Sequence, residues 1–359
     1  MNENEAREEE LHEKSYLHSS SLHWEDKETL GDDEMKRLDR VFQGLGPPHS
    51  NLKDLKILNY AGSKFPTWLE DSACSNLVKV ELRGCKKCEL LPGLGNLHSL
   101  EFLKIYAADE VKVVDGEFYG DGNDMVYFPK MKQLCFDSML SWEEWKSTEG
   151  HGDVMPSLRK LKIVRCHKLK GLPDRLPSTL KEVVIEQCDE IIWMTSNPLP
   201  LLEDLRLLGN GRGIFSNGRG LEELQTISIT HCYGLTSLLN GLGQFKALRN
   251  LCIIQRTKLR SLTDGLVQLE ALRTVRVHDC TDMQSLFGGF EQLKALRSLD
   301  ICDCPKLKPL SNLQHLTALE ELKIACCPVV TEQIEKDIEE DWRNFSHITR
   351  IVIDFQRIQ

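Results

Sequence analysis

Two cysteines in the stretch RGCKKCELLPGLGNLHSLEFLKI, residues 83–105, have the spacing of a small chemical site. Cys85 and Cys88 are separated by two residues, as in many zinc-binding and redox-active pairs. A structural zinc ion takes four ligands, and no second pair at a suitable distance accompanies these two cysteines. Their role therefore depends on the elements in which they lie.

The same stretch contains a hydrophobic pattern, Leu100-x-x-Leu103-x-Ile105, that recurs along the chain. Successive copies begin 22–31 residues apart with a median of 24, which is typical of leucine-rich repeats. Positions within a repeat are counted here from its first residue as position 0. These first residues are Leu52, Leu77, Leu100, Met131, Leu158, Leu180, Leu202, Leu224, Leu248, Leu272, Leu296, Leu319 and Ile348.

The pattern predicts one short strand in each repeat. Alternate side chains of a strand share a face, so the apolar residues at positions 3 and 5 point inward. A single repeat cannot cover its own apolar face, whereas stacked repeats bury these residues in one long core. The sequence thus predicts an α/β leucine-rich-repeat solenoid (horseshoe). About 13 parallel short strands form its concave face, and mostly irregular or short helical segments form its convex side.

Position 8 of the repeat is a turn column that holds seven of the thirteen cysteines. The chain turns out of the strand here, and a small hydrogen-bond donor suits such a buried turn. A thiol is a weak donor and a small hydrophobe. We therefore interpret Cys85 as a turn residue and Cys88 as the occupant of an apolar position three residues later. The turn-column cysteines are Cys85, Cys166, Cys188, Cys232, Cys280, Cys304 and Cys327.

Other candidate chemistry is weak. Cys302, Cys304, Cys326 and Cys327 are clustered, but the repeat register places Cys302 opposite Ala325, so no disulfide is expected. No P-loop, HExxH or GxSxG motif is present. The sequence predicts no catalytic, cofactor-binding or metal-binding residues, and hence no enzyme.

Composition and charge restrict the compartment and the partners. The chain has 359 residues, of which 41% are hydrophobic and 28% charged, which favours a packed core over disorder. The net charge of -10 is concentrated in the first 40 residues, with thirteen acidic and six basic side chains, and does not favour nucleic acid. The absence of a signal sequence and of a long apolar run, with an odd number of cysteines, predicts a cytoplasmic or nucleo-cytoplasmic protein without membrane insertion.

The predicted organisation has two parts. Residues 1–50 form an acidic N-terminal segment with a degraded first repeat, in which Ser20 stands where a leucine is expected. Residues 51–359 form the leucine-rich-repeat domain, and residues 331–359 are its C-terminal cap.

The cap combines two predicted elements. A helix over residues 331–342 places Ile334, Ile338 and Trp342 on one face, and a final strand follows from Ile348.

Three stretches depart from the repeat. GEFYGDGNDMVYFP, residues 116–129, predicts a protruding loop that is either an ordered insertion or a contact loop. GNGRGIFSNGRG, residues 209–220, lacks the spacing of a phosphate-binding loop and predicts a connection between repeats. Trp142 and Trp145 have the spacing of apolar repeat positions, which favours packing over ligand stacking.

The concave face is the predicted partner-binding surface, because side chains at positions 4 and 6 point away from the core. Six of twelve residues at position 4 are basic, and several at position 6 are apolar. Such a surface suits an acidic and apolar protein partner; an ordinary solvated sheet is the alternative. The candidate partner-binding residues are Lys56, Leu58, Lys104, Tyr106, Lys162, Val164, Arg206, Leu208, Ile254 and Arg276.

Several stretches carry a family resemblance: NLKDLKILNYAGSKFPTWL, NLVKVELRGCKKCELLPGLGNLHSLEFLKI, GEFYGDG, MPSLRKLKIVRCHKLKGLP and EEDWRNFSHITRIVID. Over residues 12–359 the chain resembles the leucine-rich-repeat region of plant intracellular immune receptors, the coiled-coil nucleotide-binding disease resistance proteins. The resemblance implies a role in the defence response: binding of pathogen proteins or guarded host proteins, and regulation of a nucleotide-binding switch module in cis or in trans.

The resemblance has a limit. The nucleotide-binding module and its P-loop are missing from this sequence, so ATP or ADP binding is not implied. A solitary repeat protein, a truncated gene product and a fragment of a longer receptor all fit.

Two other functions remain open from the residues alone. A substrate-recognition adaptor for a ubiquitin ligase needs an F-box-like helical segment before the repeats, and residues 1–50 are too polar and short to supply one convincingly. A clamp-type enzyme inhibitor needs only a binding face, and no residue argues against it.

Overall fold

The computed structural model divides the chain into two compact units, unit 1 (Met1–Leu199) and unit 2 (Pro200–Gln359). The repeated strands and their leucine cores confirm the predicted leucine-rich-repeat solenoid in each unit. The structure describes residues 3–8, 13–25, 30–46, 50–70, 74–120, 126–147, 153–191, 198–209, 221–232, 242–255, 259–262, 264–286, 289, 292–310 and 313–359.

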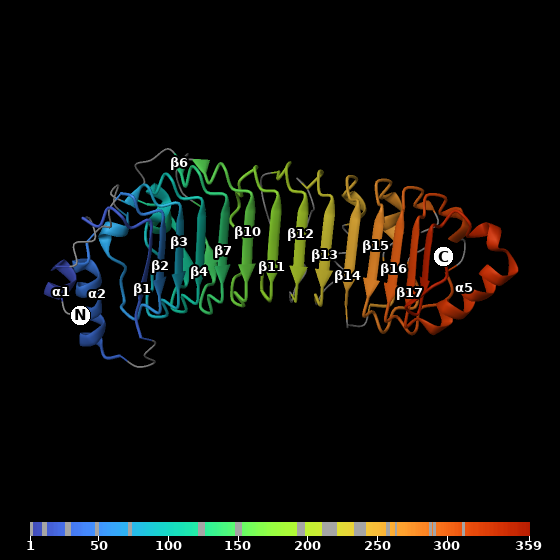
Figure 1. The fold of residues 1–359 in the computed structure, drawn as a ribbon, viewed down its shortest axis with the longest axis horizontal. Helices are drawn as coiled ribbons and strands as arrows, with labels where there is room; N and C mark the ends of the chain where they lie inside the picture. The colour runs from blue at the N-terminus through green and yellow to red at the C-terminus, as the bar shows by residue number, and fades with distance from the viewer. Residues whose placement is uncertain are drawn as a thin grey trace. The chain divides into compact units, whose positions relative to one another are not determined.

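Unit 1 is built on a parallel sheet whose strands follow one another in chain order (Figure 1). Each strand begins two residues after the first residue of a predicted repeat, and the degraded first repeat supplies the edge strand β1. In sheet order the strands are β1 (Ser19–His23), β2 (Asp54–Leu58), β3 (Lys79–Arg83), β4 (Phe102–Tyr106), β7 (Gln133–Asp137), β10 (Lys160–Val164) and β11 (Glu182–Glu186).

Unit 2 repeats the same arrangement. Its strands pair in parallel up to β18, on which the short β19 folds back antiparallel. Every strand predicted in this unit is present. In sheet order they are β12 (Asp204–Leu208), β13 (Thr226–Thr230), β14 (Asn250–Ile254), β15 (Thr274–His278), β16 (Ser298–Cys302), β17 (Glu321–Ala325), β18 (Arg350–Ile353) and β19 (Gln356–Arg357).

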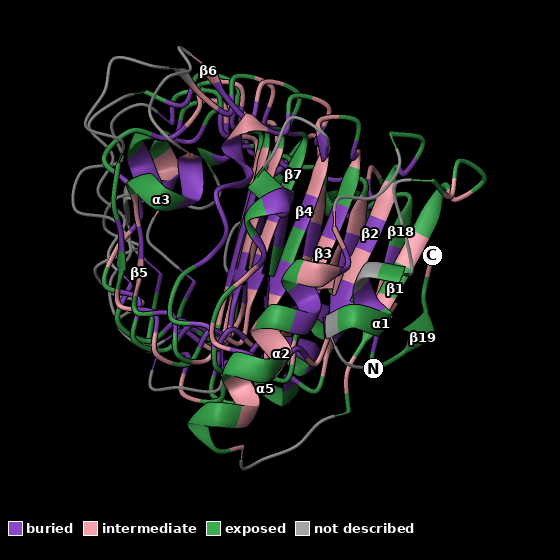
Figure 2. Cartoon of the chain, turned by 90° about the vertical axis from the view of Figure 1, so that its left-hand side faces the viewer, coloured by how far each residue is buried: buried purple, intermediate pink, exposed green. Residues whose placement is uncertain are grey.

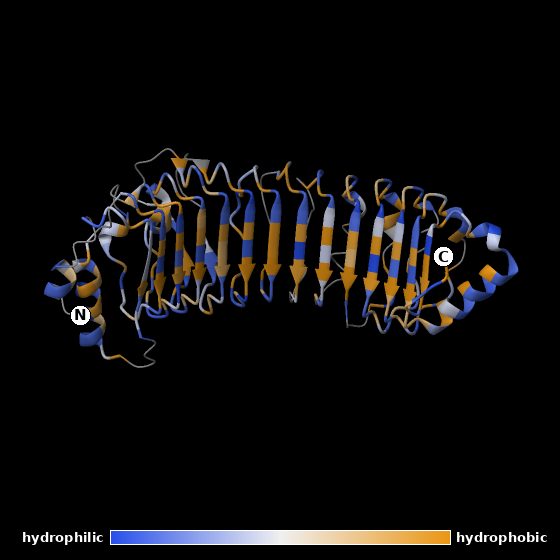
Figure 3. Cartoon of the chain, viewed as in Figure 1, coloured by the Kyte–Doolittle hydropathy of each residue, from blue (hydrophilic) through white to orange (hydrophobic). Residues whose placement is uncertain are grey.

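The core consists of the residues that the repeat pattern points inward. Positions 3 and 5, such as Leu103 and Ile105 in β4, are fully buried, as is position 0 in front of them. Figure 2 shows the result as buried bands that alternate with more exposed ones along β2, β3 and β4. The same alternation is visible in Figure 3, where apolar and polar segments follow one another along the strands. Burial of this repeated apolar surface, at about 25 cal/mol per Å², is the main force that stacks the repeats.

The cysteines of the turn column are buried in the structure. Cys85 and Cys88 are buried, and burial raises the pKa of the Cys85 thiol to about 12, so it stays protonated and can donate. The Cys88 Sγ donates to the Gly62 carbonyl at 3.4 Å. Cys188 does the same inside the repeat stack, with its Sγ 3.3 Å from the Glu186 carbonyl. The remaining turn-column cysteines, Cys166, Cys232, Cys280, Cys304 and Cys327, are also buried and lie within reach of strand-end carbonyls.

One residue before the turn column, the backbone adopts the left-handed conformation in nearly every described repeat. Position 7 has φ between 49° and 57° at residues as different as Asn59, Arg165, His231 and Cys326. Its N–H donates to the next repeat; the Arg165 amide, for example, is 2.8 Å from the Glu186 carbonyl. This hydrogen bond offsets the energetic cost of the left-handed conformation, which is unfavourable for residues other than glycine.

Helices close the N-terminal end of unit 1, which the sequence did not predict. α1 (Glu3–Glu8) and α2 (Asp32–Gly44) pack on each other. Phe42 of α2 enters an aromatic cluster with Trp24, Tyr60 and Trp68, with ring centroids 4.8–5.6 Å apart. The predicted acidic segment is therefore partly folded onto the first repeats.

The insertion at residues 116–129 packs inward in its described parts. α3 (Gly116–Tyr119) buries Phe118 and Tyr119, and Phe128 is also buried, so the expectation of a protruding loop is wrong for these residues. Aromatic side chains gain more from the core than from solvent, which draws the insertion inward. Residues 121–125 and most of the stretch 209–220 lie outside the described residues.

Two short parallel ladders join the segments that return between strands of unit 1. β5 (Val113–Val114) pairs with β8 (Glu144–Trp145), and β6 (Val126–Tyr127) pairs with β9 (Asp153–Val154). Trp142 and Trp145 are buried here, as predicted. Several other return segments are single 3₁₀ turns: η1 (Thr67–Glu70), η3 (Leu94–Asn96), η4 (Leu242–Gln244), η5 (Asp264–Gln268) and η7 (Leu313–His315).

The C-terminal cap contains the predicted helix, shifted toward the N-terminus. α5 (Pro328–Glu340) starts with Pro328, whose fixed φ suits a first helical turn. Ile334 is buried and Ile338 is half-buried, but Trp342 is 40% exposed. The placement of Trp342 on the helix's apolar face was wrong, because α5 ends at Glu340 and Trp342 begins the separate turn η8 (Trp342–Asn344).

Candidate partner-binding surface

The outer face of each sheet, meaning the side away from the leucine core, corresponds to the predicted concave face. In unit 1 its central line is formed by Lys104, Cys135 and Lys162. Cys135 pairs in register with Lys104 on one side and with Lys162 on the other. Neighbouring strands lie about 4.8 Å apart, so the two lysines are separated by two strand spacings, about 10 Å, with the thiol between them.

These two lysines form no ion pair with a described residue, although Glu81 lies in register beside Lys104. Two other lysines on this face are paired: the Lys79 Nζ lies 3.7 Å from Asp54, and the Lys160 Nζ lies 2.9 Å from Glu182. Among the described residues, no carboxylate oxygen lies within 4.0 Å of the ammonium group of Lys104 or Lys162. Their charges are thus available to a partner.

The Cys135 thiol between the two lysines is uncharged. Burial raises the pKa of Cys135, and Asp137 raises it further, while Lys104 and Lys162 act in the opposite direction. A raised pKa keeps the thiol protonated at neutral pH, so Cys135 does not cancel the positive charge of the lysines.

Beside this line, at position 6, lies an aromatic contact. The Arg83 guanidinium lies 5.1 Å from the centre of the Tyr106 ring, within cation–π range. Leu58 pairs in register with Arg83 on the next strand and is half-buried, as is Lys56 of the same strand. A half-exposed tyrosine held by a cation is a typical anchor of protein interfaces.

Val164 does not belong to the exposed surface. Its side chain is 2% exposed, so its assignment to the partner-binding set was wrong. In register, this short branched side chain lies between Asp137 and Glu186, whose longer side chains shield it. The Arg165 Nη2 lies 2.6 Å from the Asp137 carboxylate, which fixes one of these neighbours in place.

The outer face of unit 2 carries bases that are already paired. The Arg206 guanidinium lies 2.7 Å from Asp204. Asp300 faces two basic side chains, with the Arg276 Nε at 3.9 Å and the His278 Nε2 at 3.1 Å. Hydrogen bonding to Asp300 raises the pKa of His278, and that same contact lowers the pKa of Asp300. Leu208 and Ile254 are half-buried on this face.

The register thus brings together only part of the predicted set. Lys56, Leu58, Lys104, Tyr106 and Lys162 share the outer face of unit 1. The remaining candidates on unit 2, Arg206, Leu208, Ile254 and Arg276, share the outer face of that unit.

Sequence reasoning missed position 2, which also points outward because strand side chains alternate. It adds Phe102, half-buried, and Lys160 to the outer face of unit 1.

Other features bear on the class of function. Among the described residues, one trio of metal-ligating side chains has donor atoms within 4.8 Å of one another: Cys302, Asp303 and Cys326. In the part of the chain that the structure describes, no helix has the length and apolar character required to cross a membrane.

Comparison with known proteins confirms the predicted resemblance. Residues 1–108 match the family described as R13L1/DRL21 LRRs. The chain is 37% identical over 147 residues to an RPP13-like disease resistance protein of Arabidopsis thaliana, covering 39% of this chain and 14% of that protein. It is 30% identical over 254 residues to the disease resistance protein RGA2 of Solanum bulbocastanum, covering 67% of this chain and 23% of that protein.

These relatives are much longer than the chain, which spans 10–23% of the length of the first four. Among solved structures, an internalin of Listeria monocytogenes aligns over 95% of this chain and 88% of its own, with 13% identity and a TM-score of 0.42. A likeness this low carries no argument about function. The repeats are leucine-rich repeats similar to those of plant disease resistance proteins.

Proposed function

We propose that this chain is a non-catalytic protein-recognition module of a plant immune receptor, and that it binds its partner through the outer face of unit 1. The observation that carries the proposal is the pair of lysines without an ion pair to any described residue, Lys104 and Lys162, beside the Tyr106 anchor. Similarity to plant disease resistance proteins supports the defence role. The location is cytoplasmic or nucleo-cytoplasmic.

The chemistry of this face defines the partner. Two ammonium groups about two strand spacings apart match two carboxylates on a protein surface, and the half-exposed Tyr106, Phe102 and Leu58, on β4 and β2, match apolar side chains beside the carboxylate that meets Lys104. Pathogen proteins, guarded host proteins and a nucleotide-binding switch module are the candidate sources of such a surface. The inward residues fix the fold, so the outward ones can change with the partner.

The test compares two double variants with the same change in charge. Lys104→Glu with Lys162→Glu reverses the proposed site, and Lys168→Glu with Lys170→Glu reverses two exposed lysines in the turn after β10. Proteins captured from plant tissue by the tagged chain are quantified by mass spectrometry, and the strongest is then titrated in purified form. Charges buried at a contact contribute about 2 kcal/mol or more, so the first variant should bind at least tenfold more weakly.

The control sets the limits of this test. Both variants should retain the circular dichroism spectrum and melting temperature of the parent chain, since neither pair is buried. If only the variant at Lys168 and Lys170 loses the partner, the binding site does not lie on the outer face. Reproducible turnover of a small molecule by the purified chain would refute the non-catalytic assignment.

A further inference from the structure

A rule of the repeat geometry brings side chains from successive turns together. At Asn59 and Arg165, which have the left-handed conformation, the side chain at position 7 reaches back to positions 6 and 7 of the preceding repeat. The Asn59 Nδ2 thus lies 3.2 Å from the His23 Nε2, and the Arg165 guanidinium lies 2.6 Å from Asp137 and 2.9 Å from the Ser138 Oγ.

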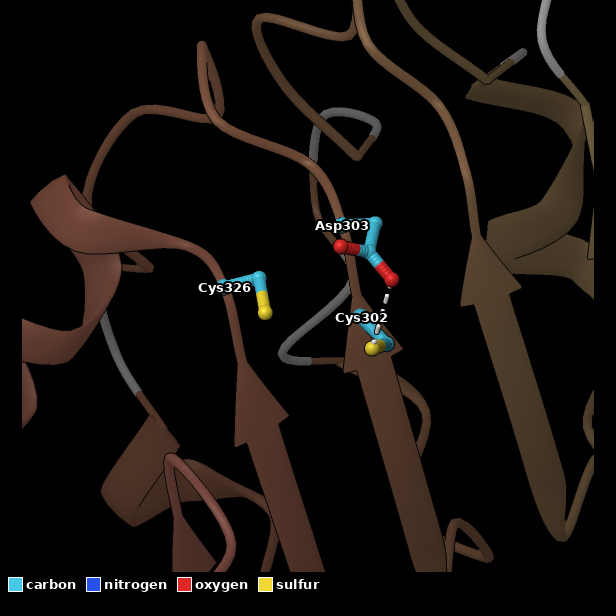
Figure 4. A group of neighbouring side chains, drawn as sticks. All are labelled: Cys302, Asp303 and Cys326. Atoms are coloured by element: carbon cyan, nitrogen blue, oxygen red, sulfur yellow. Dashed lines mark hydrogen bonds between the residues drawn. The ribbon is translucent and has the colours of Figure 1, made fainter.

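The same relation joins the ends of β16 and β17. Cys326 is at position 7 with φ 52°, while Cys302 and Asp303 are at positions 6 and 7 of the preceding repeat. Cys302 does pair in register with Ala325, as the sequence predicted, but the next residue, Cys326, brings a second thiol. Figure 4 shows the two thiols at neighbouring strand ends, with the Asp303 carboxylate beside Cys302.

The three side chains are accessible and held in position. Cys326 and Asp303 are exposed, and Cys302 is half-buried, unlike the cysteines of the turn column. The Cys302 Sγ lies 3.1 Å from the Asp303 Oδ2, and the Cys326 amide donates to the Asp354 Oδ1 at 2.8 Å. The Cys302 side chain and the Cys326 backbone are thus each held by a carboxylate.

We propose that Cys302, Asp303 and Cys326 form a binding site for a zinc-class divalent cation, with water as the fourth ligand. The donor atoms all lie within 4.8 Å of one another. Tetrahedral coordination at the usual zinc–sulfur distance of about 2.3 Å brings two sulfurs to about 3.8 Å, so the sulfurs need to approach each other by no more than about 1 Å. Two thiolates and a carboxylate select Zn²⁺ over Mg²⁺ or Ca²⁺, which prefer oxygen ligands alone.

Protonation sets the pH dependence of this site. Burial raises the pKa of Cys302 to about 12, with a further rise from Asp303, and desolvation and Asp303 also raise the pKa of Cys326. Each thiol must lose its proton to bind the cation. The carboxylates that face the site are Asp303 and Asp354. Affinity should therefore rise with pH, by up to a hundredfold per pH unit while both thiols are protonated in the free chain.

The experiment titrates the full reduced chain with Co²⁺, a spectroscopic substitute for Zn²⁺, and then displaces it with Zn²⁺. We expect one equivalent of Co²⁺ with a thiolate-to-metal charge-transfer band and tetrahedral visible bands. Cys326→Ser should weaken binding at least tenfold and reduce the charge-transfer band by about half. Cys302→Ser should do the same. Cys252→Ser, which removes another half-buried thiol of unit 2, should leave the affinity for Co²⁺ and the charge-transfer band unchanged.

Three results would overturn the proposal. The first is the absence of a thiolate charge-transfer band in the reduced parent chain up to millimolar Co²⁺. The second is a band that survives in the Cys302→Ser and Cys326→Ser double variant, which would place the metal elsewhere. The third is a reduced chain that binds no cation, but in which air oxidation links Cys302 to Cys326; that would make the pair a redox-sensitive thiol pair instead. Circular dichroism of each variant verifies that the fold is intact.

Discussion

Asp39 makes the largest set of polar contacts between helix α2 and the first repeats among the described residues. Its carboxylate accepts from the Tyr60 hydroxyl at 2.6 Å, the Ser63 hydroxyl at 2.7 Å and the Ser63 amide at 2.9 Å. Burial and the contact with Asp39 both raise the pKa of Tyr60, which keeps its hydroxyl a donor. Substituting Asp39 with alanine removes these three short bonds together with a longer one from the Lys64 amide at 3.3 Å, and leaves the buried Tyr60 hydroxyl with only the Lys64 carbonyl as an acceptor.

The expected cost follows from the number of bonds. Hydrogen bonds to charged groups contribute about 1.5–3 kcal/mol each, and half-burial of Asp39 reduces this to about 1 kcal/mol. Asp39→Ala should therefore destabilise the N-terminal end by about 3 kcal/mol. Tyr60→Phe should cost about 1 kcal/mol, and the exposed Asp33→Ala on the same helix less than about 0.5 kcal/mol.

Hydrogen exchange measured peptide by peptide tests this, because repeat proteins open locally. In Asp39→Ala, exchange in α2 and residues 59–70 should accelerate roughly a hundredfold, since 1.4 kcal/mol is a factor of ten. Exchange in unit 2 should not change. The reasoning is wrong if α2 keeps its protection in Asp39→Ala, or if Asp33→Ala has an equal effect.

Three further predictions concern other parts of the chain. A thiol reagent should label Cys326 within minutes in the native chain but leave Cys166, Cys188, Cys280 and Cys304 unlabelled until denaturant is added; early labelling of these four would contradict their burial. Deleting residues 331–359 removes β18 from β17, so exchange should accelerate first at β17, and unchanged protection there would refute the cap. The pKa of His278 is raised in the folded chain, so its contact with Asp300 stabilises unit 2 fully at pH values below the pKa of the unfolded chain, near 6.5. This stabilisation is lost as the pH rises through the pKa of the folded chain. Urea unfolding measured from pH 5.5 to 8.5 should show the loss in the parent chain but not in His278→Gln.

The sequence predicts the strands because stacking imposes them. A residue such as Leu103 can be buried only if every repeat aligns its apolar residues with those of its neighbours, so the period in the sequence gives the register directly. The same reasoning places the thiols of Cys85 and Cys188 in the turn.

What the sequence does not predict depends on side-chain length and on irregular repeats. The period assigns Arg256 to the turn column, where a charged side chain cannot be buried without a partner. In the structure the buried Gln255, one residue earlier, donates to the Cys232 carbonyl at 2.7 Å. A hydrogen-bond donor is therefore still present at this turn, but the longer amide side chain of Gln255 provides it instead of a thiol. The burial of Val164 likewise depends on its neighbours and not on its own position.

Position 7 shows where sequence and structure must be combined. Its residues differ in size and charge, so no pattern marks it in the sequence, yet its backbone is nearly constant. The constant element is the amide bond to the next repeat, which fixes the conformation whatever the side chain is. Once this conformation is known, the register predicts that position 7 contacts positions 6 and 7 of the preceding repeat. An arginine then meets an aspartate at Arg165, and a thiol meets a thiol at Cys326. The varied turn is therefore a place where the fold permits new chemistry without a change in its core.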